Sequence, residues 1–417
     1  MKHLKANIFS EIGKLNGVIL HTPGHEVENM IPENAERALY SDILNLNTAK
    51  KEYKQLNALL SELTNTFQAK ELLSDILKNN DVKTELINFI CKNENIVELT
   101  DYLCSLNHEE LSTKLIEGVV MVKDNLSKFL DKERYSLRPL HNFFFTRDAS
   151  STIYNKVLIN KMASNVRDRE SLIMEAIFKH HPLLHSETVN LARYENSDSK
   201  ATIEGGDILV AREDILLIGN GDRTTTQGID QVIEYIKKQK VKRHIIIQEL
   251  PYEPESFIHL DMAFTFLDND KCMVYEPLIL KTNRFLTIHI QIDNGKVISI
   301  KEKKSIPSAL KELGMDMEPI YCGGKKDSYI QDREQWHSGA NFFALAPGKV
   351  IGYGRNIYTI EEMNNNGFEV IKAKDVISKK INLNNYEKYV ITMEGGELAR
   401  GGGGCRCMTM PVSRSKI

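Results

Sequence analysis

The chain has 417 residues, of which 41% are hydrophobic and 27% are charged, and its formal net charge is −3 at pH 7. These values are typical of a globular protein and offer no basic surface that would bind nucleic acid. No apolar run could serve as a signal peptide or membrane span, and six cysteines are too sparse for a disulfide framework, which favours a cytoplasmic protein without membrane contact.

The first predicted feature in chain order is helical. Between Pro32 and Pro139 the sequence has no proline and one glycine, so little in it would interrupt helices. Apolar residues recur there at i, i+3 and i+4, for instance in "AKELLSDILKN", as they do in amphipathic helices. We therefore predict a helical insertion over residues 68–133, within a main α/β domain made of residues 1–67 and 134–417.

After Pro139, short strand patterns alternate with helical patterns. The strand patterns include "DILLIGN", "RHIIIQEL", "KCMVYEP", "KVIGYGRN" and "FEVIKA", and "GIDQVIEYIKKQ" is a helical one. Asn294 and Gly295 lie between two alternating apolar runs, which predicts a hairpin with a type I′ turn. The repeated strand-strand-helix-strand order predicts an α/β fold built from small modules with helices outside the sheets. A single doubly wound sheet is the alternative.

The segment "HNFFFTRDAS", residues 141–150, is the first candidate for a functional site. Its aromatic run predicts a strand that ends in Arg147 and Asp148. Strands that leave a core and end in charged residues are common, so this segment alone predicts no function.

In "TIEGGDILV", Glu204 and Asp207 are separated by two glycines. On a regular strand this spacing directs the two side chains to opposite faces, and in a helix each glycine would cost about 1 kcal/mol relative to alanine. A bend or bulge at the glycines would instead let both carboxylates converge on one point. A turn that carries two solvated acids is the alternative.

In "FIHLDMAFTFLD", His259 and Asp261 are two residues apart in an apolar segment that we expect to be a strand. A period of two places both side chains on one face. A carboxylate beside a histidine in a water-poor site raises the imidazole pKa, which suits a general acid that later acts as a base. The pair could also bind a metal or form a buried ion pair, but no third ligand follows at metal spacing.

The chain ends in "ARGGGGCRCMTMPVSRSKI", where four glycines precede Cys405 and Cys407. Most side chains that follow are apolar, so we expect this segment to be packed. An attacking thiol must ionise and needs a partner that handles protons, and His259 is the best candidate in the sequence. A zinc site and a redox pair are competing interpretations. No further Cys-x-x-Cys or Cys-His companion supports a zinc site. A disulfide between these two cysteines would be strained, which argues against a redox pair.

The stretches "FTRD", "EGGD", "HLD" and "CMTMP", in this order and spacing, together resemble arginine deiminase. The resemblance continues in "SEIGKLNGVILHTPG" and "REQWHSGANFFALAPGKVIGYGRN" and extends across nearly the whole chain. It implies the pentein fold, a five-bladed α/β propeller with an inserted helical bundle. It also implies a homo-oligomeric enzyme, a dimer or a tetramer, that hydrolyses free L-arginine to L-citrulline and ammonia through a covalent Cys-thiouronium intermediate, with no metal and no cofactor.

The resemblance also implies roles for residues at matching positions. Cys407 corresponds to the nucleophile, and His259 to the general acid and base. A guanidinium has five N–H donors in one plane and requires several carboxylates. Four acids correspond to those that grip it and complete its hydrogen bonds: Asp148, Asp207, Glu204 and Asp261. Arg167 and Arg223 correspond to the arginines that hold the α-carboxylate of the substrate. Asn142 and Phe145 correspond to residues that line its amino-acid end, and Gly401 to a glycine whose backbone touches the substrate.

Two residues depart from the family pattern. Gly402 stands where some members carry an arginine that gates the substrate. Cys405 adds a second thiol, which could protect Cys407 by reversible oxidation or serve as an inert filler. Four carboxylates near Cys407 predict that its pKa is raised without substrate and lowered when a substrate cation binds.

Three other functions stay open from the sequence. A related enzyme could act on agmatine, methylated arginine or an amidino acceptor, although Arg167 and Arg223 argue against agmatine, which has no α-carboxylate. A catalytically silent arginine-binding protein would not need Cys407 and His259. A metal-dependent hydrolase would use the same histidine and acids as ligands, and chelators would inhibit it.

Overall fold

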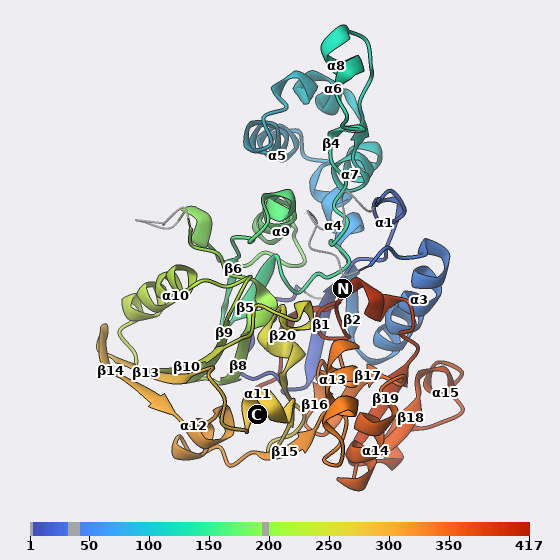
Figure 1. Cartoon of the computed structure of the whole chain (residues 1–417). Helices are drawn as coiled ribbons and strands as arrows, with labels where there is room; N and C mark the ends of the chain where they lie inside the picture. The colour runs from blue at the N-terminus through green and yellow to red at the C-terminus, as the bar shows by residue number, and fades with distance from the viewer. Residues whose placement is uncertain (1–2, 32–41, 194–199) are drawn as a thin grey trace.

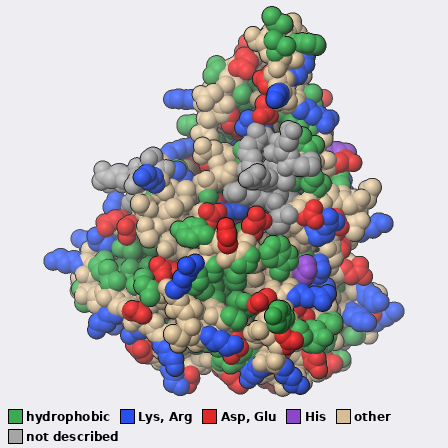
Figure 2. Space-filling view, viewed as in Figure 1, with side chains coloured by type: hydrophobic (Ala, Val, Ile, Leu, Met, Phe, Trp, Pro, Cys, Tyr) green, Lys and Arg blue, Asp and Glu red, His purple; other side chains and the backbone are tan. Residues whose placement is uncertain are grey.

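The computed structural model describes residues 3–31, 42–193 and 200–417. Five sheets form the body of the molecule, and a helical arm projects from it (Figure 1). Within the described ranges, no helix is long and apolar enough to cross a membrane. On the face in Figure 2, Lys and Arg side chains are interspersed with Asp and Glu, in agreement with the small net charge.

As far as the described residues show, the five sheets share one arrangement, in which two strands pair antiparallel and a third runs parallel to one of them. In one module, β5 (Ser150–Ile153) turns into β6 (Lys156–Ile159), and after α9 (Asp168–His180) the chain returns as β7 (Thr188–Asn190) beside β6. The corresponding strands elsewhere are β8 (Ile208–Arg212), β9 (Ile215–Asn220) and β10 (Arg243–Glu249); β11 (Phe264–Phe266), β12 (Lys271–Val274) and β15 (Glu318–Tyr321); β16 (Phe343–Ala346), β17 (Lys349–Tyr353) and β19 (Tyr389–Met393); and β20 (Met410–Arg414), β1 (Leu15–Leu20) and β2 (Asn65–Gln68).

These modules confirm the predicted α/β class and show that the doubly wound alternative is wrong, because the strands divide among separate sheets. The strands expected in "DILLIGN" and "RHIIIQEL" are β9 and β10, and helix α10 (Thr226–Lys238) connects them. The hairpin of β13 (Thr287–Asp293) and β14 (Lys296–Lys303) turns at Asn294 and Gly295, which have the positive φ values of 47° and 77° that its turn requires.

The arm consists of short helices that follow α3 (Leu46–Leu63), a helix that packs on the body. They are α4 (Ala69–Ile76), α5 (Asn80–Asn93), α6 (Thr100–Ser105), α7 (His108–Glu117) and α8 (Leu126–Leu130). The absence of proline suggested helix throughout, but in the described residues between Gly118, whose φ of 86° ends α7, and Pro139, only α8 is helical. There β3 (Val119–Val120) pairs with β4 (Tyr135–Leu137) instead. The insertion boundaries 68–133 stay a prediction.

The two ends of the chain meet in one sheet. Strand β20 pairs antiparallel with β1, and Val18 lies opposite Pro411. Met408, Met410 and Val412 are all at most 1% exposed, which confirms that the tail is packed. The last residues before the C-terminus therefore anchor the segment that carries Cys407.

Candidate active site

The segment before Cys407 is held by close packing. After the short helix η8 (Leu398–Gly401), Gly402 has a φ of 85°. A Cβ on Gly403 would lie 2.4 Å from the ring of Phe145, and one on Gly404 would lie 2.5 Å from Asn341 Oδ1. The glycines are therefore needed for close approach to their neighbours, and they place Phe145 against the turn that leads to Cys407.

The segment 141–149 lies directly against this turn. We expected a strand here, but the structure has consecutive turns, and β5 begins only at Ser150. Arg147 anchors these turns, because its backbone N–H donates to the carbonyl of Cys407 at 3.1 Å and its Nε donates to the carbonyl of Arg406 at 3.1 Å. These two bonds bring Asp148 to the site.

The two glycines of "EGGD" form the predicted bend, the short helix η4 (Gly205–Asp207). A Cβ on Gly206 would lie 2.3 Å from Nδ1 of His259, so this bend requires glycine. Glu204 and Asp207 are fully buried, and the alternative of two solvated acids is therefore wrong. Burial, with some help from Asp261, raises the pKa of Asp207 to about 6 although His259 opposes this.

His259 contacts two of the predicted acids. Its Nε2 is 3.0 Å from Glu204 Oε2, and its Nδ1 is 3.7 Å from Asp148 Oδ1. Burial favours the neutral imidazole, but Asp148, Glu204 and Asp207 outweigh it and raise the pKa of His259 to about 9. The expected strand is wrong here: His259 caps η6 (Leu260–Met262), which is held because the Leu260 N–H donates to Asp207 Oδ1 at 2.8 Å.

The thiol of Cys407 is 2% exposed and faces Asp261, whose carboxylate oxygens lie 3.8 and 3.9 Å from Sγ. Burial raises the pKa of Cys407 well above its ordinary value, and Asp261 and Asp148 raise it further. In the described residues, no hydrogen bond joins this thiol to His259. The pKa of Cys407 is thus raised in the direction that the sequence predicted, but burial is the first cause, and of the four predicted acids Asp261 and Asp148 contribute.

Arg167 places its guanidinium among the acids. Its Nη1 donates to Asp148 Oδ2 at 3.1 Å and to Glu204 Oε2 at 3.4 Å, and its Nε and Nη2 donate to Glu170 at 3.0 and 2.9 Å. Arg223 Nη1 lies 3.6 Å from the same oxygen of Glu204. Burial would raise the pKa of Glu204, but His259 and the two arginines lower it. Both predicted arginines thus lie at the site, where their guanidinium groups contact its carboxylates.

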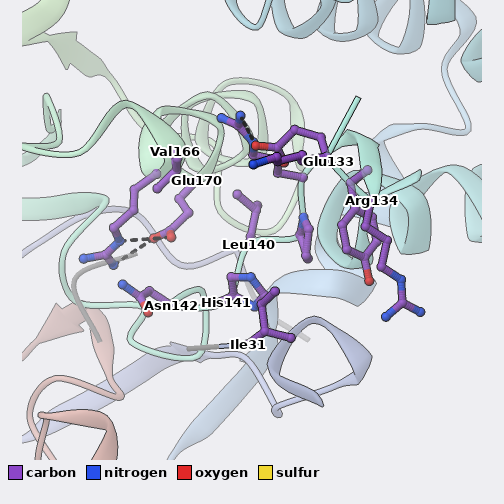
Figure 3. Close-up of a pocket in the computed structure, with 13 residues that line it drawn as sticks. Ile31, Glu133, Arg134, Leu140, His141, Asn142, Val166 and Glu170 are labelled. Atoms are coloured by element: carbon purple, nitrogen blue, oxygen red, sulfur yellow. Dashed lines mark hydrogen bonds and ion pairs between the residues drawn. The ribbon is translucent and has the colours of Figure 1, made fainter. Parts of the chain in front are cut away.

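A cavity of about 180 Å³ adjoins these acids where the chain returns from the arm to the body. Figure 3 shows Asn142 and Glu170 in its wall, and the dashed lines at Glu170 are its two bonds to Arg167. Its lining includes two of the residues predicted for the amino-acid end of a substrate, Asn142 and Arg167. Gly401 lies near Phe145 beside the turn of Cys407, because a Cβ on Gly401 would lie 3.4 Å from the Phe145 ring.

Asp148, Glu204 and His259 also form a group that could hold a metal ion, since their donor atoms lie within 4.8 Å of one another. Oxygen and nitrogen ligands of this kind suit a divalent cation. The guanidinium of Arg167, however, hydrogen-bonds to both carboxylates of the group. A metal ion there would be repelled by this neighbouring cation.

The sequence reasoning missed two buried residues next to the thiol, Arg406 and Asn341. Arg406 Nη1 donates to Asp261 Oδ2 at 2.7 Å, and its Nε donates to Glu11 Oε2 at 3.0 Å. Asn341 Nδ2 lies 3.2 Å from Cys407 Sγ. The signals were present, because Arg406 precedes the cysteine and Asn341 lies in a stretch of the family resemblance to which no role was given.

Comparison with known proteins gives matches along nearly the whole chain. The profile of the arginine deiminase family matches residues 36–414. An arginine deiminase from Listeria monocytogenes serotype 4a is 34% identical over 437 residues, which cover 100% of each chain.

Solved structures give a more distant likeness. SxtG, an amidinotransferase from Microseira wollei, has a TM-score of 0.52 and 13% identity, and the match covers 99% of this chain and 98% of that chain. The N-terminal domain of ArgZ, covalently bound to a reaction intermediate, has a TM-score of 0.51 and 12% identity over 95% of this chain and 98% of that chain. At these identities the likeness shows a shared α/β fold. The family profile and the full-length relative show that this chain is an enzyme of the arginine deiminase family.

Proposed function

We propose that this chain hydrolyses free L-arginine to L-citrulline and ammonia through a covalent thiouronium intermediate on Cys407. The observation that carries the proposal is a set of buried polar atoms suited to a planar cation. Asp148 Oδ1, which lies 3.7 Å from His259 Nδ1, and Asp207 Oδ2 have no hydrogen-bond partner among the described residues. Unpaired buried acceptors are costly, and the N–H groups of a guanidinium would pair both carboxylate oxygens.

The substrate itself activates the nucleophile in this proposal. A guanidinium between the acids places a positive charge near Cys407, which lowers the thiol pKa and releases its proton to solvent. The thiolate then attacks the guanidinium carbon and forms an S–C bond in a tetrahedral adduct. The acids that hold the thiol neutral without substrate are the same groups that bind the substrate.

His259 moves the protons of the reaction. Its imidazole is protonated at pH 7, because its pKa is about 9. It donates this proton as the C–N bond breaks, so that ammonia leaves and the thiouronium stays on sulfur. The neutral imidazole then takes a proton from water, which attacks the same carbon. Cleavage of the S–C bond releases citrulline and Cys407.

Arg167 and Arg223 bind the α-carboxylate in this proposal, with Asn142, Phe145 and Gly401 around the amino-acid end. The Arg167 guanidinium must first leave Asp148, since a substrate cation needs that carboxylate. Glu170 can keep its two bonds to Arg167 during this movement, because they use nitrogens other than the one that contacts Asp148. Arg167 thus exchanges its contact with Asp148 for a contact with the α-carboxylate of the substrate.

We also propose that the five sheets are the five blades of a pentein propeller, with the site at its centre and residues 68–133 as an insertion. The repeated pairing of antiparallel and parallel strands supports this proposal. Each module needs its neighbours to bury its inner face. Glu204, His259 and Cys407 come from the joints between different modules, as such an arrangement requires.

The direct test incubates the purified chain with L-arginine or agmatine, with and without EDTA, and measures ammonia and the ureido product. We expect turnover of L-arginine only, with no effect of the chelator. Cys407→Ser should lower kcat by at least about 1,000-fold and still bind arginine in calorimetry. Cys405→Ser is the matched control, because it removes the other thiol of this turn, and it should turn over at a rate close to that of the unaltered chain.

Each alternative gives a different result in the same test. Turnover of agmatine would show that the arginines do not select an α-carboxylate. Inhibition by EDTA would point to the metal-dependent hydrolase. Binding of arginine without ammonia release by the unaltered chain would identify a silent binding protein and reject the proposal.

A further inference from the structure

The side chain of Asn341 lies beside the thiol and has no place in the reaction steps above. It stands between α13 (Ser328–Trp336) and β16, far in sequence from Cys407, and it is 1% exposed. A buried amide is stable only where its N–H and C=O groups find hydrogen-bond partners, because each unpaired group costs free energy. The hydrogen-bond partners of Asn341 therefore indicate which groups of the site it positions.

The orientation of this amide follows from its partners. Oδ1 accepts the backbone N–H of Arg406 at 2.8 Å and of Cys407 at 3.4 Å, and Nδ2 donates to the carbonyl of Asp261 at 3.2 Å. A flipped amide would set its own N–H groups against two backbone donors. Nδ2 is therefore the atom that faces Cys407 Sγ at 3.2 Å.

The other groups around the sulfur do not replace this donor. Asp261 and Asp148 disfavour the thiolate, and the Arg406 cation, which favours it, is bound to Asp261 and Glu11. The phenol of Tyr353 donates to the carbonyl of Gly403. Within the described residues, the Asn341 amide lies at hydrogen-bond distance from the sulfur, and a backbone hydrogen bond at Gly404 also lowers the pKa of Cys407.

We propose that Asn341 is a further catalytic residue, whose Nδ2 donates a hydrogen bond to the thiolate of Cys407 while Oδ1 fixes the backbone from which the sulfur attacks. This proposal rests on the proposed function and deepens it. A hydrogen bond to a charged acceptor is stronger than one to a neutral acceptor, so the amide stabilises the thiolate more than the thiol. It thereby opposes the two acids at the moment when the nucleophile forms.

The test is the pH dependence of iodoacetamide alkylation of Cys407, read by mass spectrometry of the C-terminal peptide, with Cys407→Ser as the labelling blank. If Asn341→Ala removes a thiolate donor, the midpoint of alkylation should rise by about one pH unit. A purely structural role predicts the opposite sign, because a loosened turn exposes the sulfur and burial is the main cause of its raised pKa. An unchanged or lowered midpoint would overturn the proposal.

Glu52→Ala is the matched control, since Glu52 accepts the N–H groups of Glu397 and Leu398, in the segment that precedes this turn, and in the described residues no contact joins it to the sulfur. It should leave the midpoint unchanged or lower it. If Asn341→Ala does not fold, Asn341→Ser carries the same test, because its hydroxyl can accept from the backbone but is too short to reach the sulfur. For Asn341→Ser too, a raised alkylation midpoint supports the proposal, and an unchanged or lowered midpoint rejects it.

Turnover gives a second readout. In Asn341→Ala, kcat for L-arginine should fall by about 100-fold while KM changes little, because the lost bond stabilises the charged sulfur and does not touch the bound cation. Alkylation does not require turnover. A chain that fails to hydrolyse arginine would therefore reject the proposed function, whereas the direction of the alkylation shift alone decides the role of Asn341.

Discussion

The thiol and the imidazole of this site share one acid, Asp148, which acts on them in opposite senses. Burial is the main cause of the raised pKa of Cys407, and Asp261 and Asp148 add to it, which favours the neutral thiol. At His259, Asp148 and two further acids outweigh burial and raise the pKa to about 9, which favours the charged imidazole. A substrate cation would lower both values. One binding event would then create the nucleophile and strengthen the acid.

This coupling predicts that ligands change the reactivity of the thiol. A non-reactive guanidinium compound should shift the alkylation midpoint of Cys407 to lower pH, although it partly covers the sulfur. The measurement is the rate of alkylation across the pH range with and without saturating ligand. An already ionised thiol at pH 7 in the ligand-free enzyme would contradict the prediction.

His259 should also affect folding stability in a defined pH window. Its folded pKa of about 9 lies above the ordinary value of 6.5, so its stabilising contribution is complete below pH 6.5 and is lost as pH rises through 9. The difference in free energy of unfolding between the unaltered chain and His259→Gln should therefore shrink by about 3 kcal/mol across this window. Denaturant unfolding at several pH values measures it.

His25→Gln is the control for this experiment, because the His25 side chain is 65% exposed and its contact with Glu28 lies at the surface. The free energy of unfolding of this variant should stay within about 1 kcal/mol of that of the unaltered chain. A difference between the unaltered chain and His259→Gln that does not depend on pH would show that the histidine is neutral at pH 7 in the folded enzyme.

At the scale of elements, helix α3 holds the turn that carries the nucleophile. The carboxylate of Glu52 accepts the N–H of Glu397 at 3.0 Å and of Leu398 at 2.8 Å, at the start of η8. We expect Glu52→Ala to lower the free energy of unfolding by about 2 kcal/mol, because a buried N–H group at Leu398 and a half-buried one at Glu397 lose their acceptor. It should also lower kcat. Thermal unfolding and steady-state kinetics check both effects.

Lys51→Ala serves as the control, since Lys51 is the exposed neighbour of Glu52 on the same helix. It tests whether the loss of any long side chain from α3 is enough to lower the free energy of unfolding or kcat. Equal effects of Lys51→Ala and Glu52→Ala would contradict the anchoring role.

Regular elements were predictable from the sequence, and the irregular segments of the site were predictable only in part. The run of isoleucines in β10 and the turn at Asn294 obey local rules of periodicity and turn formation. The segments of Asp148 and His259 carry strand-like apolar residues, yet they form turns, because Arg147 and Asp207 bind backbone groups from other modules. Such long-range bonds leave no local pattern in the sequence.

The placement of side chains in the site shows the same limit. Glycines at 205 and 206 predicted the bend at Glu204, since only a bend explains them. The contacts of Arg167 with Asp148 and of Asn341 with Cys407 join residues that are distant along the chain. Their assignment requires coordinates, because neither residue type nor spacing distinguishes them from surface residues.

At the scale of the whole molecule, the first and last strands depend on each other. Val412 and Arg414 of β20 are buried, and Arg414 Nη1 donates to the carbonyl of Gly13 at 2.8 Å. Removal of residues 410–417 should therefore abolish cooperative thermal unfolding and turnover. Removal of residues 415–417, which are exposed, is the control and should preserve both. A stable enzyme without β20 would contradict the dependence.

The pairing of β1 with β20 also bears on the order of events during synthesis. Strand β1 is synthesised long before β20, so this edge of β1 lacks its partner until the segment that carries Cys407 has been made. A chain that stops before Met410 has no strand to pair there, and the turn of Cys407 then loses the strand that follows it.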